Sequence, residues 1–125
     1  MEYAIEIKEL CKKFGSFTAV NKISFKIPTG KIFGFLGPNG SGKSTTIRML
    51  CGVITPTSGE GKVLGCDIYK DTEKLKQSIG YMSQRFGLYE DLTVDENIHF
   101  YGNIYSIGKG ELTVRKQRII KMYGL

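Results

Sequence analysis

A glycine-rich stretch with one lysine carries the clearest chemical signal in this chain. Residues 37–45 fit the pattern G-x-x-x-x-G-K-[ST], in which backbone N–H groups surround the phosphates of a nucleotide. Glycines in such a loop adopt positive φ and let phosphate oxygens approach the backbone. Lys43 can reach the β- and γ-phosphates, and the Ser44 hydroxyl can coordinate the accompanying Mg²⁺. The pattern predicts a phosphate-binding loop made of Gly37, Pro38, Asn39, Gly40, Ser41, Gly42, Lys43, Ser44 and Thr45.

The flanking segments decide between a phosphate loop and a chance glycine turn. Residues 31–36 form a nearly continuous apolar run, which is typical of a strand covered on both faces. After the loop, Ile47 and Leu50 begin an apolar helical face, and Gly52 stands where a helix ends. A helix beginning near Lys43 would direct free amides and the positive end of its dipole at the phosphates. Strand, loop and helix in this order favour a phosphate loop.

Composition narrows the class of protein. A chain of 125 residues that is 41% hydrophobic suits one small folded domain. The net charge of +6 comes from scattered lysines and arginines, which favours a solvated basic surface over a nucleic-acid site. Three widely spaced cysteines and a single histidine argue against zinc and favour buried thiols in a reducing compartment. With no apolar run of about 20 residues and no secretory signal, we expect a cytosolic chain.

The remaining pattern indicates strands first and helices later. Alternating apolar and polar residues predict half-buried strands at 5–8 and 23–27, shorter strands at 62–64 and 79–82, and a helix over 71–77 capped by Asp71. Thr93 and Glu96 form a capping box before a helical pattern, and another helix is predicted to end near Gly124. We interpret 1–87 as part of a nucleotide-binding core and 88–125 as the start of a helical subdomain, within one incomplete domain.

Several motifs in a fixed order resemble one family. Phe14-Gly15, the strand at 32–36, the loop, Pro-Thr-Ser-Gly at 56–59 and Tyr-Met-Ser-Gln at 81–84 resemble the ATP-binding subunits of ABC transporters. The stretch 88–97 is similar to the drug-exporter type, and the resemblance extends from about residue 5 to residue 125. It implies an α/β fold, with a P-loop NTPase core of the ABC ATPase type, an N-terminal antiparallel β subdomain and the start of a helical subdomain.

The same resemblance implies ligands, partners and a location. ATP and Mg²⁺ would be the cofactors, and ATP binding and hydrolysis would drive export through a membrane permease. The partners would be that permease and a second ATPase copy, and no nucleic acid is expected. The chain would lie on the cytoplasmic face of the membrane through the permease.

Three further assignments follow from the resemblance alone. Phe14 would stack on adenine, although Phe17 is a rival for this role and a core aromatic is the plainer alternative. Gln84 would coordinate Mg²⁺ and position the attacking water, against the alternative of an ordinary surface glutamine. The segment after it (Phe86, Leu88 and Tyr89) would contact the permease or form a small satellite core.

Other features of the family are absent from the sequence. The Leu-Ser-Gly-Gly-Gln signature, the later histidine and the apolar strand ending in adjacent acidic residues do not occur. Asp67 is interpreted as a turn residue and His99 as an ordinary helical residue. We therefore expect the N-terminal half of a catalytic domain, which alone binds ATP weakly at best and turns it over negligibly.

Three alternatives remain open at this point. A soluble ABC-type ATPase of translation or DNA repair is disfavoured by the exporter-like stretch 88–97. A nucleotide-binding remnant without turnover would share the same loop. A nucleotide kinase or GTPase is disfavoured because no guanine-reading motif is present. The transported substrate and the direction of transport are not encoded in these residues.

Overall fold

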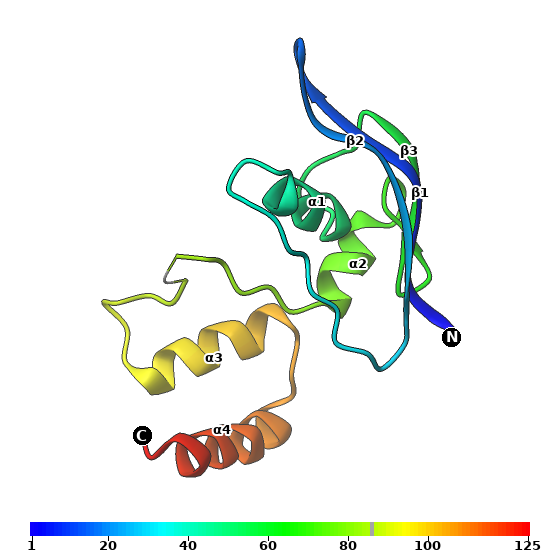
Figure 1. Ribbon diagram of the computed structural model, residues 1–125. Helices are drawn as coiled ribbons and strands as arrows, with labels where there is room; N and C mark the ends of the chain where they lie inside the picture. Colours follow the sequence, from blue (N-terminus) through cyan, green and yellow to red (C-terminus); the bar gives the residue numbers. More distant parts are fainter. Residues whose placement is uncertain (86) are drawn as a thin grey trace. The chain divides into compact units, whose positions relative to one another are not determined.

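The computed structural model describes residues 1–85 and 87–125, which form two compact units, Met1–Tyr81 and Met82–Leu125 (Figure 1). The first unit holds β1 (Tyr3–Phe14), β2 (Phe17–Pro28), α1 (Lys43–Leu50), β3 (Ser58–Val63), β4 (Cys66–Asp67) and α2 (Thr72–Ser78). The second unit holds α3 (Val94–Ile104) and α4 (Lys109–Tyr123). The assignment of 1–87 and 88–125 to a nucleotide-binding core and a helical subdomain stays a prediction.

A sheet in the order β2-β1-β3-β4 organises the first unit, and all its pairings are antiparallel. β1 and β2 are each 12 residues long, so the strands predicted at 5–8 and 23–27 are confirmed and extend further. The strand predicted at 62–64 lies within β3 up to Val63, while Leu64 turns the chain with a φ of 51°. Between Lys12↔Val20 and Lys13↔Thr18 the register shifts, which leaves Ala19 as an extra residue in β2.

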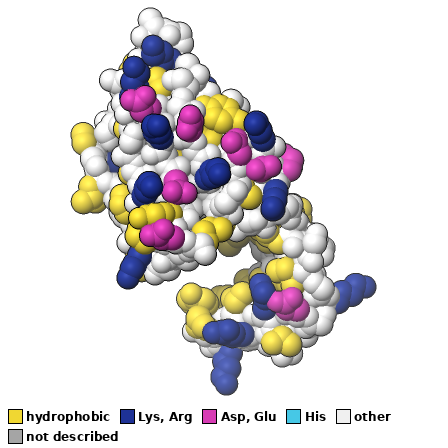
Figure 2. All heavy atoms as spheres, turned by 90° about the vertical axis from the view of Figure 1, so that its right-hand side faces the viewer, with side chains coloured by type: hydrophobic (Ala, Val, Ile, Leu, Met, Phe, Trp, Pro, Cys, Tyr) yellow, Lys and Arg dark blue, Asp and Glu magenta, His cyan; other side chains and the backbone are white. Residues whose placement is uncertain are grey.

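The core of the first unit lies between this sheet and two helices. α1 and α2 lie on the same side of the sheet (Figure 1). The buried side chains come from β1, β2, β3 and β4 on one side and from α1 and α2 on the other: Ile7, Leu10, Val20, Val63, Cys66, Met49, Leu50 and Leu75, with Ile68. The opposite side of the unit carries acidic and basic side chains interspersed (Figure 2). Lys26 of β2 and Glu6 of β1 form an ion pair at 3.4 Å.

α1 has the boundaries that the sequence predicts. It begins at Lys43 after Gly42, and Gly52 follows its C-cap with a φ of 73°. The Gly52 amide donates to the Met49 carbonyl at 3.1 Å, and the Val53 amide donates to the Arg48 carbonyl at 2.9 Å. This pair of hydrogen bonds is a Schellman motif, which satisfies carbonyls that the helix end leaves free.

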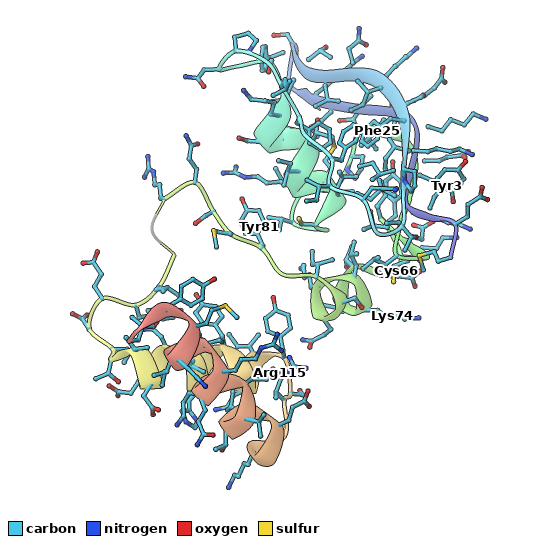
Figure 3. The ribbon with its side chains drawn as sticks, turned by 60° about the horizontal axis from the view of Figure 1, so that its bottom comes forward. Tyr3, Phe25, Cys66, Lys74, Tyr81 and Arg115 are labelled. Carbon is cyan, nitrogen blue, oxygen red and sulfur yellow. The ribbon has the colours of Figure 1, made fainter. Side chains whose placement is uncertain are left out.

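The strand predicted at residues 31–36 is wrong. This segment pairs with no strand among the described residues, and Ile32 and Leu36 are fully exposed. Phe33 and Phe35 instead pack against Phe25 of β2, with ring centroids 6.0 and 5.6 Å from that ring. Phe25 is labelled in Figure 3. An apolar run becomes a strand only beside neighbours that supply hydrogen bonds, and the described sheet supplies none here. The strand predicted at 79–82 is absent from the described structure as well.

Local sequence signals placed the helices more accurately. The helix predicted over 71–77 is α2, one residue further on, with Asp71 at the N-cap position but without a side-chain capping bond. Thr93 and Glu96 make the predicted capping box, each side chain accepting from the other's amide at 3.1 Å. Gly124 ends α4 in the left-handed region, as predicted. No helix in the described part of the chain has both the length and the hydropathy to cross a membrane.

Two side-chain networks organise the second unit. Lys116 of α4 forms an ion pair with Asp95 of α3 at 2.6 Å, and this hydrogen bond holds the pKa of Asp95 below its ordinary value. His99 lies 3.6 Å from Asp95 and 3.3 Å from Lys116, half exposed on α3. Asn97 is buried, with 7% of its surface exposed, and binds the segment before α3. The pattern of apolar residues had not singled out Asn97.

Candidate functional site

Residues 37–45 form a loop that leads directly into α1. Gly40 and Gly42 have φ of 83° and 93°, in the region that L side chains rarely adopt. The Ser41 amide donates to the Pro38 carbonyl at 3.2 Å, which closes a tight turn at the start of the loop. The predicted glycine-dependent turn is therefore present.

Close packing against β2 adds a second reason for glycine at position 42. A Cβ at Gly42 would lie 2.5 Å from the Ala19 carbonyl oxygen and 3.3 Å from Val20 Cγ2. Ala19 is the extra residue of the register shift in β2. The loop is thus seated on the irregular part of this strand, and any side chain at position 42 would displace it.

The start of α1 has the electrostatics of an anion-binding helix end. No acidic residue lies in its first turn, and Gly42 offers no side chain to cap it. The Gly42 carbonyl accepts from the Thr46 amide at 2.9 Å and from the Thr46 hydroxyl at 2.8 Å. The amides before Thr46 have no acceptor within the helix, so they can donate to a bound anion.

Lys43 and Ser44 carry the groups that a metal–phosphate ligand would need. The Lys43 ammonium donates to the Gly37 carbonyl and so folds back over the start of the loop. Ser44 is exposed, and its hydroxyl oxygen is the kind of ligand that Mg²⁺ prefers. A cation, free amides and a hydroxyl within one loop fit a magnesium-bound phosphate chain.

A cavity of about 490 Å³ lies beside the loop. Its walls come from the loop and α1, from β2 and from the end of the exposed apolar segment: Ser41, Gly42, Lys43 and Thr46, then Thr18, Ala19, Val20, Asn21, Ile23 and Phe25, then Phe35 and Leu36. Its volume falls within the range of small-molecule sites. The loop therefore borders a space in which the remainder of a nucleotide can lie.

Phe14 and Phe17 occupy the end of the β1–β2 hairpin, which projects beyond the rest of the sheet (Figure 1). They are paired across the strands, next to the cavity-lining Thr18. Phe14 is 49% exposed and Phe17 is 62% exposed, so neither is a core aromatic. Both rings are available for stacking, and their exposure alone does not choose between them.

The residues expected after the core strand lie in the second unit. Gln84 is exposed, and its approach to Mg²⁺ stays a prediction. Tyr89 packs edge-on against Phe100, with ring centroids 4.9 Å apart, and it lines an apolar cavity of about 570 Å³ together with Leu88. These contacts favour the satellite-core interpretation of Tyr89, while about half of both side chains stays exposed. Phe86 lies outside the described residues.

Asp67 serves the backbone of its own turn. Its Oδ1 accepts from the Tyr69 amide at 2.8 Å and from the Lys70 amide at 3.1 Å. These two hydrogen bonds lower the pKa of the carboxyl group. The carboxylate is occupied by the turn between β4 and α2, as the sequence interpretation expected.

Sequence reasoning missed Thr46 and Lys12. Thr46 is buried and holds the Gly42 carbonyl through its hydroxyl, a bond four residues back that Thr can make within a helix. Lys12 lies over the Phe14 ring. Alternation along a strand offered a signal for Lys12, because residues two apart point to the same face.

Comparison with known proteins places these features in a family. Residues 20–125 match the family described as ABC transporter. The probable multidrug ABC transporter ATP-binding protein YbhF of Escherichia coli is 45% identical over 99% of this chain and 22% of its own length. The linearmycin resistance ATP-binding protein LnrL of Bacillus subtilis is 41% identical over 97% of this chain and 39% of its own length. The bacitracin transport ATP-binding protein BcrA of Bacillus licheniformis is 38% identical over 87% of this chain and 36% of its own length.

Solved structures agree with this fold. An ATP-binding subunit of an ABC transporter superposes with a TM-score of 0.76 at 25% identity, over 86% of this chain and 45% of that chain. A dimeric ATP-binding cassette in a post-hydrolysis state, bound to ADP and Pi, superposes with a TM-score of 0.78 at 27% identity. The match covers 97% of this chain and 57% of that chain. The chain thus spans less than two thirds of the length of each of these relatives.

Proposed function

The chain belongs to the ABC transporter family, and from this premise we propose that it is the ATP-binding portion of an exporter's ATPase. The complete protein would couple ATP binding and hydrolysis to export of a substrate through a membrane permease. The names of three relatives, which refer to multidrug transport, linearmycin resistance and bacitracin transport, support the exporter type. The substrate stays unassigned.

One observation carries the proposal. The loop of residues 37–45 joins two left-handed glycines to the uncapped, acid-free start of α1, beside a cavity. Backbone amides in this arrangement bind phosphate oxygens through both direct hydrogen bonds and the helix dipole. The triphosphate, rather than the base, would therefore supply most of the affinity, because charge-assisted hydrogen bonds are the strong ones.

Within the loop each residue type has a defined task. The Lys43 ammonium would leave the Gly37 carbonyl and donate to the β- and γ-phosphates, where the anionic acceptor is stronger than a neutral carbonyl. Gly42 and Thr46 would keep the first amides of α1 pointed at the phosphates. Phe14 would stack on the base at the end of the hairpin, and base selectivity would be weak.

A magnesium ion fits the oxygen ligands that the loop offers. Ser44 would hold it through the exposed hydroxyl, and Gln84 would add its amide oxygen. The ion would neutralise charge on the phosphates when bound. Gln84 would also orient the attacking water by accepting a hydrogen bond from it through the amide oxygen.

Partners follow from the family. The permease would meet the segment around Leu88 and Tyr89, where about half of each side chain is exposed. A second ATPase copy would face the nucleotide, and the dimeric state of one solved relative supports the presence of a second copy. The chain would then be peripheral, on the cytoplasmic face of the membrane.

Calorimetric titration with MgATP and with magnesium tripolyphosphate tests the proposal. We expect both ligands to bind the chain, and Lys43→Met to weaken both by roughly tenfold or more, because a charge-assisted hydrogen bond is lost. Lys31→Met is the matched control, since Lys31 is exposed and precedes the loop. This substitution should leave the affinities for both ligands unchanged. Wild-type affinity in Lys43→Met, or no affinity for either ligand in the natural chain, would refute the phosphate site.

A further inference from the structure

The side chain of Lys12 makes two contacts at the end of the hairpin. Its Nζ lies 5.1 Å from the centroid of the Phe14 ring and over the ring face. The same Nζ donates to the Thr55 carbonyl at 2.8 Å. Lys12 and Phe14 stand two residues apart on β1, so the pleat places both side chains on one face of the strand.

The Lys12 ammonium covers one face of the Phe14 ring, and 49% of the Phe14 surface stays exposed. A cation within about 6 Å of an aromatic ring is attracted to its π face. The ammonium therefore occupies one side of the ring, and a stacked base can use only the other side. Phe17, the register partner, has no cation over its ring among the described contacts and is more exposed. This difference distinguishes two phenylalanines that the sequence alone leaves as rivals.

The segment at residues 55–57 anchors the lysine to the body of the first unit. Besides the Lys12–Thr55 bond, the Thr57 amide donates to the Cys11 carbonyl at 2.8 Å. The Thr57 hydroxyl accepts from the Lys13 amide at 2.9 Å. The end of β1 is thus tied to the chain that follows α1. A ring held in this way loses less conformational freedom when a base stacks on it.

We propose that Lys12 is a positioning residue for base recognition: it fixes the Phe14 ring so that one face stays open to the nucleobase. This inference rests on the proposed function, because it concerns the base end of the same nucleotide site. Lys12 contributes to the base-dependent part of the affinity and leaves binding of the phosphates unchanged.

The ratio of MgATP affinity to magnesium tripolyphosphate affinity isolates this contribution. Lys12→Met keeps most of the aliphatic stem and removes the charge, and it should lower MgATP affinity about two- to fivefold. Tripolyphosphate affinity should stay unchanged. Lys12→Arg should restore the ratio, because a guanidinium can both donate to the Thr55 carbonyl and lie over a ring. Lys13→Met is the matched control, since it changes a neighbouring lysine whose contact with Thr57 is made by the backbone.

The outcomes separate the two proposals. Absence of tripolyphosphate binding in the natural chain would refute the phosphate site and the role of Lys12 with it. Normal tripolyphosphate binding, with an unchanged ratio in Lys12→Met, would overturn the role of Lys12 alone. A nucleotide-free test uses NMR: the ε-methylene protons of Lys12 should show an upfield ring-current shift that Phe14→Leu removes and Phe17→Leu keeps. A shift that is absent, or that depends on Phe17, would also overturn the proposal.

Discussion

Replacing Gly42 by alanine should destabilise the chain more than replacing Gly40. Both glycines lie in the proposed phosphate-binding loop and have similar φ, 93° at Gly42 and 83° at Gly40. They differ in their surroundings. A Cβ at Gly42 would lie 2.5 Å from the Ala19 carbonyl oxygen, whereas a Cβ at Gly40 would have no atom within 4 Å. The two variants therefore share backbone strain, and only one adds a steric clash.

The expected magnitudes follow from this difference. An L residue held in the left-handed region costs about 1–2 kcal/mol, which both variants should lose. Overpacking costs about 1–3 kcal/mol more, and it applies only at Gly42, where the obstructing atom belongs to the backbone of β2. We expect Gly40→Ala to lower the free energy of unfolding by about 1–2 kcal/mol and Gly42→Ala to lower it by about 2–5 kcal/mol.

Urea denaturation without nucleotide measures both values. The midpoint and slope of each transition give the free energy of unfolding, and an unchanged slope shows that the same surface is exposed on unfolding. Equal losses in the two variants would refute the reasoning, because they would mean that the contact between the loop and β2 does not constrain position 42. A smaller loss at Gly42 than at Gly40 would refute it as well.

Three further substitutions test the packing and the electrostatics of the two units. Asn97→Ala removes the Oδ1 atom that accepts from the Tyr89 amide at 2.9 Å, so hydrogen exchange at that amide should accelerate. The free energy of unfolding should fall by about 2–3 kcal/mol, because buried hydrogen bonds are lost. Met49→Ala empties a fully buried position and should lower the free energy of unfolding by about 2–5 kcal/mol in urea. Because Lys116 depresses the pKa of Asp95, this pair stabilises the fold above the ordinary carboxyl pKa and loses its effect as pH falls. Asp95→Asn should therefore reduce the drop in the urea midpoint between about pH 7 and about pH 3.

Features that depend on a few neighbouring residues could be predicted from the sequence. The capping box of Thr93 and Glu96 needs only residues three apart, and the glycine after α1 needs only the last turn of that helix. The loop at residues 37–45 is similar, because its turn, its left-handed glycines and the helix that follows are all set within residues 37–45 and α1. Its binding of phosphate stays a prediction. In each case the atoms that satisfy the backbone lie within one turn of the residue that signals them.

Features that depend on distant segments could not be predicted. The apolar run at 31–36 has the composition of a buried strand, but composition does not supply the hydrogen-bonding neighbour that makes a strand. The close approach of Gly42 to Ala19, which leaves no room for a Cβ, is equally invisible in the sequence, since it depends on a register shift in β2. Asn97 was missed for a different reason: an amide that satisfies several carbonyls of a preceding loop has no apolar periodicity to reveal it.

The β1–β2 hairpin connects the two ends of the proposed nucleotide site. Gly42 of the loop packs against Ala19 of β2, and the Phe14 ring stands at the end of β1. The two strands are hydrogen-bonded from Tyr3↔Pro28 to Phe14↔Phe17. Because backbone pairing is stiffer than contacts between flexible side chains, the hairpin would mainly set the separation between the Phe14 ring and the amides proposed to bind phosphate. Changes at Ala19 should therefore affect base and phosphate binding together, whereas changes at Lys12 should affect the base alone.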